Sequence, residues 1–338
     1  MERDSSKEFY FQWHFLNSCN LRCTHCYQEN YKYMDMDLEN LLRIADELIS
    51  ALTKWGMSGR ISLTGGEPFL SKHLYNLLDY LNRSEKIVSI DILTNGTLIT
   101  DEDVTKLKQY DKLHQIQISL DGGTEKIHDS IRGNGNFRKA INGIRNLKAG
   151  GLEVALMYTL QKLNIDGYDD FINLAISENV DAVTVERVTP CGQSALEEII
   201  PADEIKRIYT DITKRANKML AKPVIRRGRP LWINTVCDST RTDCTIGGFC
   251  PVGFTALAIL HDGTVLPCRR MEIPLGNILT DGLYKIWYTS DVLWKIRDKN
   301  NLKGKCHGCE NLPFCGGCRA VAYAATGDYM EEDPQCWK

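Results

Sequence analysis

Three cysteines near the start of the chain have a spacing that favours an iron–sulfur cluster. Cys19, Cys23 and Cys26 lie in the run NSCNLRCTHCYQ, separated by three residues and then two. A structural zinc ion takes four ligands, so three thiolates do not complete a zinc site by themselves. Three thiolates can hold three irons of a four-iron cluster and leave the fourth iron open. An open iron beside a reducing cluster is a place to bind and cleave a small molecule. A metal-free or zinc-binding cysteine cluster is the alternative interpretation.

Other polar and glycine residues follow short apolar segments further along the chain. Gly65, Gly66, Glu67 and Pro68 follow the apolar run ISL, and Asn95 follows IVSIDIL. Ser119 lies in the run QIQISL, Asp121 follows this run directly, and Arg132 comes soon after. Glycines permit close backbone approach to a ligand, and a guanidinium pairs well with a carboxylate. Taken singly, the same residues could form an ordinary turn, a helix cap or a surface ion pair.

The elements that must position these residues alternate between strand and helix. Apolar runs predict strands, and helical spacing predicts the segments between them. Strands are expected at 9–16, 61–63, 87–93, 115–120, 154–160 and 182–188, and helices at 38–52, 71–82, 101–109, 137–149 and 166–178. Such alternation implies a parallel sheet whose active site lies at the carboxyl ends of the strands. Six units are fewer than the eight of a closed barrel, so we expect an α/β fold with a partial (β/α)₆ TIM-like barrel.

The chain divides into three parts on composition. The barrel is expected over residues 9–200, and a helical linker that includes a helix at 201–220 over residues 201–239. Residues 240–338 are rich in Cys, Gly and turn residues, with one helical stretch near 282–297, and predict a small α+β domain.

The overall composition restricts the class of protein. The chain has 338 residues, 43% of them hydrophobic, and a formal net charge of −3. This charge gives no general attraction to nucleic acid or anionic lipid. No apolar run is long enough to span a membrane, and the N-terminus does not resemble a signal peptide. An odd total of 13 cysteines then argues against a disulfide framework. We therefore expect a cytoplasmic, metal-binding protein that binds neither nucleic acid nor membranes.

Together the motifs resemble those of the radical S-adenosylmethionine (SAM) enzymes. The resemblance rests on the CxxxCxxC run followed by Tyr27, the GGEP turn, and the pattern ISLDG followed by Arg132. It implies that the three cysteines hold a [4Fe–4S] cluster whose open iron binds SAM. It also implies which residues contact SAM. The amino group of SAM would lie at the GGEP turn, its carboxylate at Ser119 or Arg132, and its other polar groups at Asp121 and Asn95.

Eight further cysteines lie in the last part of the chain. Eight is two sets of four, and four thiolates coordinate either a [4Fe–4S] cluster or a zinc ion, which spacing alone does not separate. Their order resembles the SPASM domain, which carries two auxiliary clusters. The resemblance assigns Cys244, Cys250, Cys268 and Cys318 to the cluster nearer the active site, and Cys306, Cys309, Cys315 and Cys336 to the outer one. The spacing before Cys318 departs from the family pattern. Two residues separate Cys318 from the preceding cysteine, Cys315, where the family more often has three. The expected cofactors are therefore three [4Fe–4S] clusters and SAM.

Several candidate residues lie near the end of the sixth strand and beside Cys268. Glu186 is a candidate substrate base, and Cys191 a candidate hydrogen donor to a substrate radical, although a small buried cysteine is the more common case. Cys237 is expected to be structural. Arg269 and Arg270 suit an acidic or carboxylate-bearing substrate, or form a surface pair. In sulfatase maturases an aspartate follows the cysteine that matches Cys268, so Arg269 counts against that activity.

The resemblance implies an oxidoreductase or peptide maturase. SAM would be cleaved reductively to a 5′-deoxyadenosyl radical that removes hydrogen from a substrate C–H bond. A ribosomally made peptide is the favoured substrate, and oxidation of a tetrapyrrole side chain or other small molecule is the alternative. The 18 residues before Cys19 leave no room for a fused leader-binding domain, so a partner protein could supply one. A flavodoxin or ferredoxin is the expected reductant. Other classes that stay open are a zinc-stabilised binding module, an electron carrier, and an enzyme that transfers methyl or aminocarboxypropyl groups.

Overall fold

The computed structural model describes most of the chain. The described residues are 7–28, 31, 35–194, 196–218, 222–227, 231, 233–237, 242–246, 248–313 and 315–338. Strands β8 (Ile233–Cys237) and β9 (Thr242–Ile246) are described as backbone only. Among the described helices, none combines the length and the apolar character needed to cross a bilayer.

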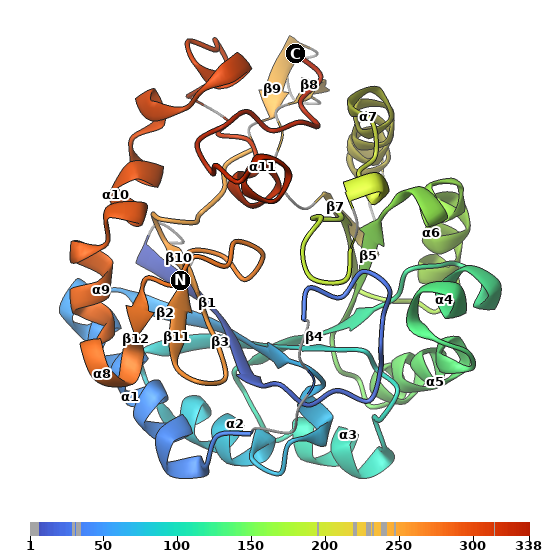
Figure 1. The fold of residues 1–338 in the computed structure, drawn as a ribbon. Helices are drawn as coiled ribbons and strands as arrows, with labels where there is room; N and C mark the ends of the chain where they lie inside the picture. The colour runs from blue at the N-terminus through green and yellow to red at the C-terminus, as the bar shows by residue number, and fades with distance from the viewer. Residues whose placement is uncertain are drawn as a thin grey trace.

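A strongly curved sheet of ten strands forms the centre of the molecule (Figure 1). The strand order is β12-β11-β10-β1-β2-β3-β4-β5-β6-β7, and every neighbouring pair from β10 to β7 is parallel. The first six strands are β1 (Glu8–Leu16), β2 (Ser58–Gly65), β3 (Ile87–Thr94), β4 (Leu113–Ser119), β5 (Val154–Leu160) and β6 (Ala182–Arg187). The predicted α/β fold with a parallel partial barrel is confirmed.

Helices follow the strands and cover the outside of the sheet (Figure 1). They are α1 (Leu38–Trp55), α2 (Leu74–Arg83), α3 (Asp101–Leu107), α4 (Glu125–Arg132), α5 (Asn136–Ala149), α6 (Tyr168–Ser177) and α7 (Ala202–Lys218). Local signals fix their ends: Asp37 accepts a hydrogen bond from the Asn40 N–H at the start of α1, and Gly56 ends it with a φ of 65°. Sequence analysis missed α4, a short and largely polar helix after the fourth strand.

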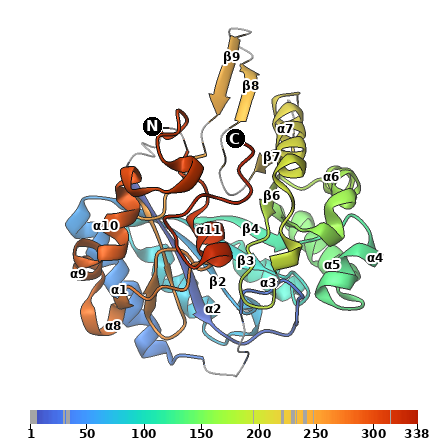
Figure 2. The ribbon, with the colours of Figure 1, turned by 45° about the horizontal axis from the view of Figure 1, so that its top comes forward.

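The cysteine-rich part of the chain adds strands to the same sheet. β10 (Ala256–Ile259) pairs in parallel with β1, and β11 (Thr264–Leu266) and β12 (Gly276–Asn277) extend the sheet antiparallel. At the other edge, β7 (Val224–Arg227) pairs with β6. The paired strands β8 and β9 extend away from the barrel (Figure 2). The sheet is therefore continuous from the barrel into the C-terminal region.

Aromatic packing joins the C-terminal helices to the barrel. These helices are α8 (Ile278–Asp281), α9 (Leu283–Thr289), α10 (Asp291–Arg297) and α11 (Arg319–Thr326). The Phe9 ring on β1 lies 4.8 Å from the Trp55 ring and 5.0 Å from the Trp287 ring of α9, measured between centroids. Phe9 is 1% exposed. Burial of these apolar rings stabilises the packing of the C-terminal helices against the barrel.

Candidate functional site

One cavity of about 450 Å³ collects most of the residues that the sequence singled out. Side chains from β1 to β6 line it, as the carboxyl-end rule for parallel strands predicts. Cysteines from both ends of the chain also line it, namely Cys19, Cys23, Cys26, Cys250, Cys268 and Cys318. The three-cysteine loop and three cysteines of one proposed auxiliary set thus face the same space.

The loop that carries the first three cysteines presents donors to their sulfurs. The Leu21 N–H lies 3.4 Å from the Cys19 Sγ, and the Gln28 N–H lies 3.4 Å from the Cys26 Sγ. Burial raises the pKa of Cys19 to about 11 and also raises that of Cys23, with the neighbouring thiols adding to the effect. Thiolates crowded in this way need a nearby positive charge, which a cluster supplies. The Nδ1 atom of His25 is buried without a hydrogen-bond partner among the described residues. These features fit a [4Fe–4S] cluster with SAM beside it.

The GGEP turn packs directly against the start of the cysteine loop. The Gly66 N–H donates to the Leu16 carbonyl at 3.1 Å, and the Glu67 N–H donates to the Ser18 carbonyl at 2.8 Å. A Cβ on Gly66 would lie 2.0 Å from the Ser18 oxygen, and one on Gly65 would lie 2.2 Å from the Leu16 oxygen. Glycine is therefore required here by the neighbouring backbone as well as by the cavity that both glycines line.

Glu67 points away from the cavity and joins two strand ends. Its side chain is 0% exposed. The carboxylate accepts hydrogen bonds from Thr94 Oγ1 at 2.6 Å, from the Asn95 N–H at 2.8 Å and from the Phe69 N–H at 3.2 Å. Burial nevertheless raises the pKa of Glu67 to about 6. Neither Glu67 nor Pro68 lines the cavity, so their place is behind the site.

Of the other residues expected to contact SAM, some line the cavity and one does not. Asn95, Ser119 and Arg132 line the cavity, whereas Asp121 does not. Asn95 Nδ2 donates to Asn20 Oδ1 at 2.9 Å, which ties the third strand end to the cysteine loop. Asp121 is 0% exposed and holds the guanidinium of Arg132, with the Nε and Oδ2 atoms 2.6 Å apart.

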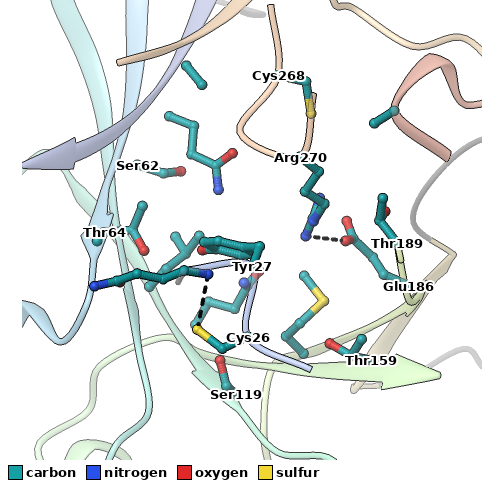
Figure 3. Close-up of a pocket in the computed structure, with 18 of the residues that line it drawn as sticks. Cys26, Tyr27, Ser62, Thr64, Ser119, Thr159, Glu186, Thr189, Cys268 and Arg270 are labelled. Atoms are coloured by element: carbon teal, nitrogen blue, oxygen red, sulfur yellow. Dashed lines mark hydrogen bonds and ion pairs between the residues drawn. The ribbon is translucent and has the colours of Figure 1, made fainter. Parts of the chain in front are cut away.

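Glu186 and Arg270 form an ion pair at the cavity. Arg270 Nη2 lies 2.8 Å from Glu186 Oε2, and Figure 3 shows the two side chains pointing toward each other near Tyr27. Both residues and Cys191 line the cavity. The pair joins β6 to the loop after Cys268. Burial alone would lower the pKa of Arg270, but the negative charge of Glu186 raises it above its usual range.

Arg269 has different partners from Arg270. It forms an ion pair with Glu272, and its guanidinium lies 4.7 Å from the centre of the Tyr27 ring. Arg269 is 8% exposed and does not line the cavity, so the two adjacent arginines differ in their access to a substrate.

A second set of four cysteines surrounds a smaller cavity. Cys306, Cys309, Cys315 and Cys336 line a space of about 20 Å³. Burial raises the pKa of Cys306 and of Cys336, and the Gly317 N–H donates to the Cys315 Sγ at 3.3 Å. These are the four residues that the sequence assigned to the outer cluster, and the donor set suits one.

The described cysteines form neither a disulfide nor a site for a single metal ion. The side chains of Cys237 and Cys244 lie outside the described residues. The described cysteines form no disulfide. Within the described residues, no group of three or more His, Cys, Asp or Glu side chains is arranged to hold a single metal ion. A four-iron cluster, by contrast, distributes its thiolates over separate irons.

Sequence analysis missed Arg187, which holds the last segment of the chain. Its guanidinium binds Asp333, and its Nη1 also donates to Gln335 Oε1 at 2.8 Å. Asp333 accepts in turn from the Cys318 N–H at 2.8 Å. The partners are 146 residues apart in the sequence, so no local pattern could have shown the contact.

Comparison with protein-family models gives two matches. Residues 13–175 match the radical SAM superfamily, and residues 250–310 match the SPASM iron–sulfur cluster-binding domain. The first match contains the three-cysteine loop and strands β2 to β5, and the second begins at Cys250.

Similar proteins align along almost the whole chain. The AdoMet-dependent heme synthase of Methanosarcina barkeri is 28% identical, over 96% of this chain and 95% of that protein. The mycofactocin maturase MftC of Mycobacterium tuberculosis is 27% identical, over 99% of this chain and 84% of that protein.

Solved structures share the fold. Streptococcus suis SuiB bound to precursor peptide SuiA has a TM-score of 0.75 at 19% identity, covering 98% of this chain and 76% of that one. The structure anSMEcpe with bound AdoMet and a peptide has a TM-score of 0.74 at 18% identity, covering 97% of this chain and 94% of that one. At these identities the likeness concerns the fold alone.

Proposed function

We propose that this chain, which belongs to the radical SAM superfamily and carries a SPASM domain, crosslinks, epimerises or oxidises a ribosomally made peptide. When bound, the cluster and SAM supply a 5′-deoxyadenosyl radical, and the auxiliary clusters accept electrons. The proposal is supported by the shared cavity, which is lined both by Cys19, Cys23 and Cys26 and by Cys250, Cys268 and Cys318. A substrate in that cavity lies between the site of radical formation and an electron acceptor.

The protein's own residues contact SAM and fix the strand ends around it. In this proposal Gly65 and Gly66 present backbone groups to the SAM amino group, and Ser119 and Asn95 contact its other polar groups, since all four line the cavity. Glu67, Pro68 and Asp121 act from behind the site by fixing the strand ends.

Glu186, Arg270 and Cys191 are the proposed substrate-contacting groups. The ion pair with Arg270 keeps the Glu186 carboxylate in place at the cavity, where it can accept a proton from the substrate. Cys191 is proposed as a hydrogen donor to a substrate radical, because its thiol faces the same cavity.

The peptide substrate is supported by the likeness to a peptide maturase. MftC aligns over 99% of this chain, and the fold is shared with SuiB, which has been solved with its precursor peptide. The proposal includes a separate leader-binding protein, a flavodoxin or ferredoxin as reductant, and the reducing cytoplasm as the compartment, which suits the many cysteines.

A second candidate is oxidation of a tetrapyrrole side chain. It is favoured by the heme synthase of Methanosarcina barkeri, which this chain matches over 95% of that protein's length. The proposed chemistry at the cluster is the same, and only the substrate differs.

The test separates the two candidates. The anaerobically reconstituted enzyme is incubated with SAM and dithionite, either with candidate precursor peptides or with Fe-coproporphyrin III, and the products are analysed by mass spectrometry. A peptide that loses hydrogen, or that takes up deuterium when the reaction is run in D2O, together with 5′-deoxyadenosine, supports the peptide proposal. Modification of the porphyrin alone overturns it in favour of the second candidate.

A further inference from the structure

We propose that Arg319 is a counter-ion of the outer auxiliary cluster and raises the reduction potential of that cluster. The outer cluster is the one expected on Cys306, Cys309, Cys315 and Cys336. The inference rests on the proposed function, because it assumes iron–sulfur clusters on the C-terminal cysteines. Arg319 does not line the cavity proposed for SAM and substrate, so its role concerns electron uptake by the cluster alone.

Arg319 is a buried arginine whose guanidinium is bonded on one side only. It is the first residue of α11 and is 7% exposed. Its Nη1 donates to the Tyr329 carbonyl at 2.9 Å and to the Glu331 carbonyl at 2.6 Å, which ties down the loop after the helix. The Nε and Nη2 atoms are buried and have no hydrogen-bond partner among the described residues. Buried donors without partners are rare in folded proteins, so this edge calls for an explanation.

The charge of Arg319 is also without a counter-ion in the part of the chain that the structure describes. The acidic side chains of the neighbouring loop have another basic partner: Lys303 Nζ lies 2.6 Å from Asp328 and 3.8 Å from Glu331. A buried charge that lacks a partner is strongly destabilising. The start of a helix is itself positive and adds to the cost of a cation there. The surroundings of Arg319 therefore favour a nearby anion.

The unbonded edge of Arg319 lies beside the outer set of cysteines. A Cβ on Gly317 would lie 2.7 Å from Arg319 Nη2 and 2.9 Å from the Asp333 Cβ. Gly317 and Asp333 both line the small cavity that the four outer cysteines surround. Burial raises the pKa of Cys306, and the charge of Arg319 is the largest influence that lowers it. The guanidinium thus lies behind the wall of this cavity, close enough to act on an anionic cluster within it.

A second buried arginine near the cysteines differs from Arg319 in its charge balance. Arg187 pairs with Asp333, whose carboxylate also accepts from the N–H of Cys318, a residue of the inner set. The opposite charges of this pair largely cancel at a distance. The inner set therefore lies beside a compensated charge, and Arg319 brings an uncompensated one to the outer set.

The effect on the potential follows from the charge that reduction adds. Four thiolates give a [4Fe–4S] cluster a net negative charge, and reduction adds one more electron. A buried cation nearby stabilises the reduced cluster more than the oxidised cluster. Arg319 therefore makes the outer cluster easier to reduce, which suits a cluster that accepts electrons in the proposed function.

The experiment is a redox titration of the holoenzyme with dithionite, followed by electron paramagnetic resonance (EPR). The signal of the outer cluster is the one that is lost in Cys309→Ala. Arg319→Gln should lower the midpoint potential of this cluster by about 59 mV, which is a tenfold change for one electron, and should leave the other two potentials in place. Arg319→Lys keeps the charge and should stay closer to the wild-type potential. Arg138→Gln is the matched control, because Arg138 pairs with Glu125 at the surface with 77% of its side chain exposed.

Each outcome decides the question. An outer-cluster potential that is unchanged or raised in Arg319→Gln would overturn the inference, and so would an equal shift in all three clusters. If Arg319→Gln does not retain the outer cluster, Arg319→Lys decides. A lysine variant that holds the cluster near its wild-type potential supports the role of the charge. Loss of the cluster in this variant too would leave Arg319 only its bonds to the Tyr329 and Glu331 carbonyls, and would overturn the inference. A wild-type protein that binds zinc at the outer cysteines would instead overturn the auxiliary clusters of the proposed function.

Discussion

The guanidinium of Arg187 lies 2.8 Å from the carboxylate of Asp333, and neither side chain is exposed. Arg187 ends β6 of the barrel, and Asp333 precedes Cys336 near the end of the chain. Asp333 also accepts from the Cys318 N–H, so one carboxylate connects the barrel to the segments that carry cysteines of both proposed auxiliary sets. The position of those cysteines relative to the cavity depends on this pair.

Removing one partner of the pair should destabilise the protein. Asp333→Asn leaves the Arg187 charge buried without its counter-ion, and the cost of such a change is about 3–5 kcal/mol. The free energy of unfolding from anaerobic denaturant titration measures it, and the auxiliary iron content should fall as well. Arg207→Gln is the control, since Arg207 pairs with Glu204 at 63% and 40% exposure. Equal stability of Asp333→Asn and the control would contradict the role of the pair.

Gly192 should be required for the first cluster. A Cβ at this position would lie 2.5 Å from the Cys26 carbonyl oxygen and from the Tyr27 backbone, and the next residue, Gln193, donates its N–H to the same oxygen at 2.7 Å. Gly192→Ala would therefore displace the cysteine loop. Of about twelve irons in three four-iron clusters, we expect about four to be lost.

A matched control separates this clash from backbone strain. Gly192 has a φ of 63° and Gly151 a φ of 78°, but a Cβ on Gly151 would meet nothing within 4 Å. Gly151→Ala should cost stability through its left-handed backbone and keep its full iron content. If both variants keep their iron, the loop after β6 does not position the cluster.

Glu67 should give the protein a measurable pH dependence. Its pKa is raised from 4.5 to about 6 in the folded protein, so the folded state binds a proton more tightly than the unfolded state. The contribution of Glu67 to stability therefore increases as pH falls from 6 to 4.5, by about 2 kcal/mol. The difference in unfolding free energy between wild type and Glu67→Gln, followed across this window, isolates the effect. A difference that does not change with pH would show that Glu67 titrates normally.

Arg270 should govern the use of substrate. Arg270→Gln removes the partner that orients Glu186 at the cavity, so the rate of product formation should fall at least tenfold. Arg270→Lys should restore part of the activity by returning the charge. Arg226→Gln is the control, because Arg226 is an exposed residue of β7. Full turnover by Arg270→Gln would remove the ion pair from the proposed substrate site.

The sequence was most informative where chemistry depends on residue spacing. The CxxxCxxC run located the first cluster loop, and alternating apolar segments located six strands of the sheet. Local pattern could not show which side of a turn faces a ligand, so Glu67 was expected at SAM although it is buried behind the turn. It also could not show contacts between distant segments. Arg187 with Asp333, and β10 with β1, depend on how the chain returns to the barrel.

The most direct test of the account is the iron content and SAM cleavage of the anaerobically purified protein. After reconstitution we expect about twelve irons per chain, from three four-iron clusters. Addition of dithionite and SAM should yield 5′-deoxyadenosine, and Cys23→Ala should abolish that product while the auxiliary iron remains. A protein that binds zinc in place of iron, or that leaves SAM intact, would contradict the account.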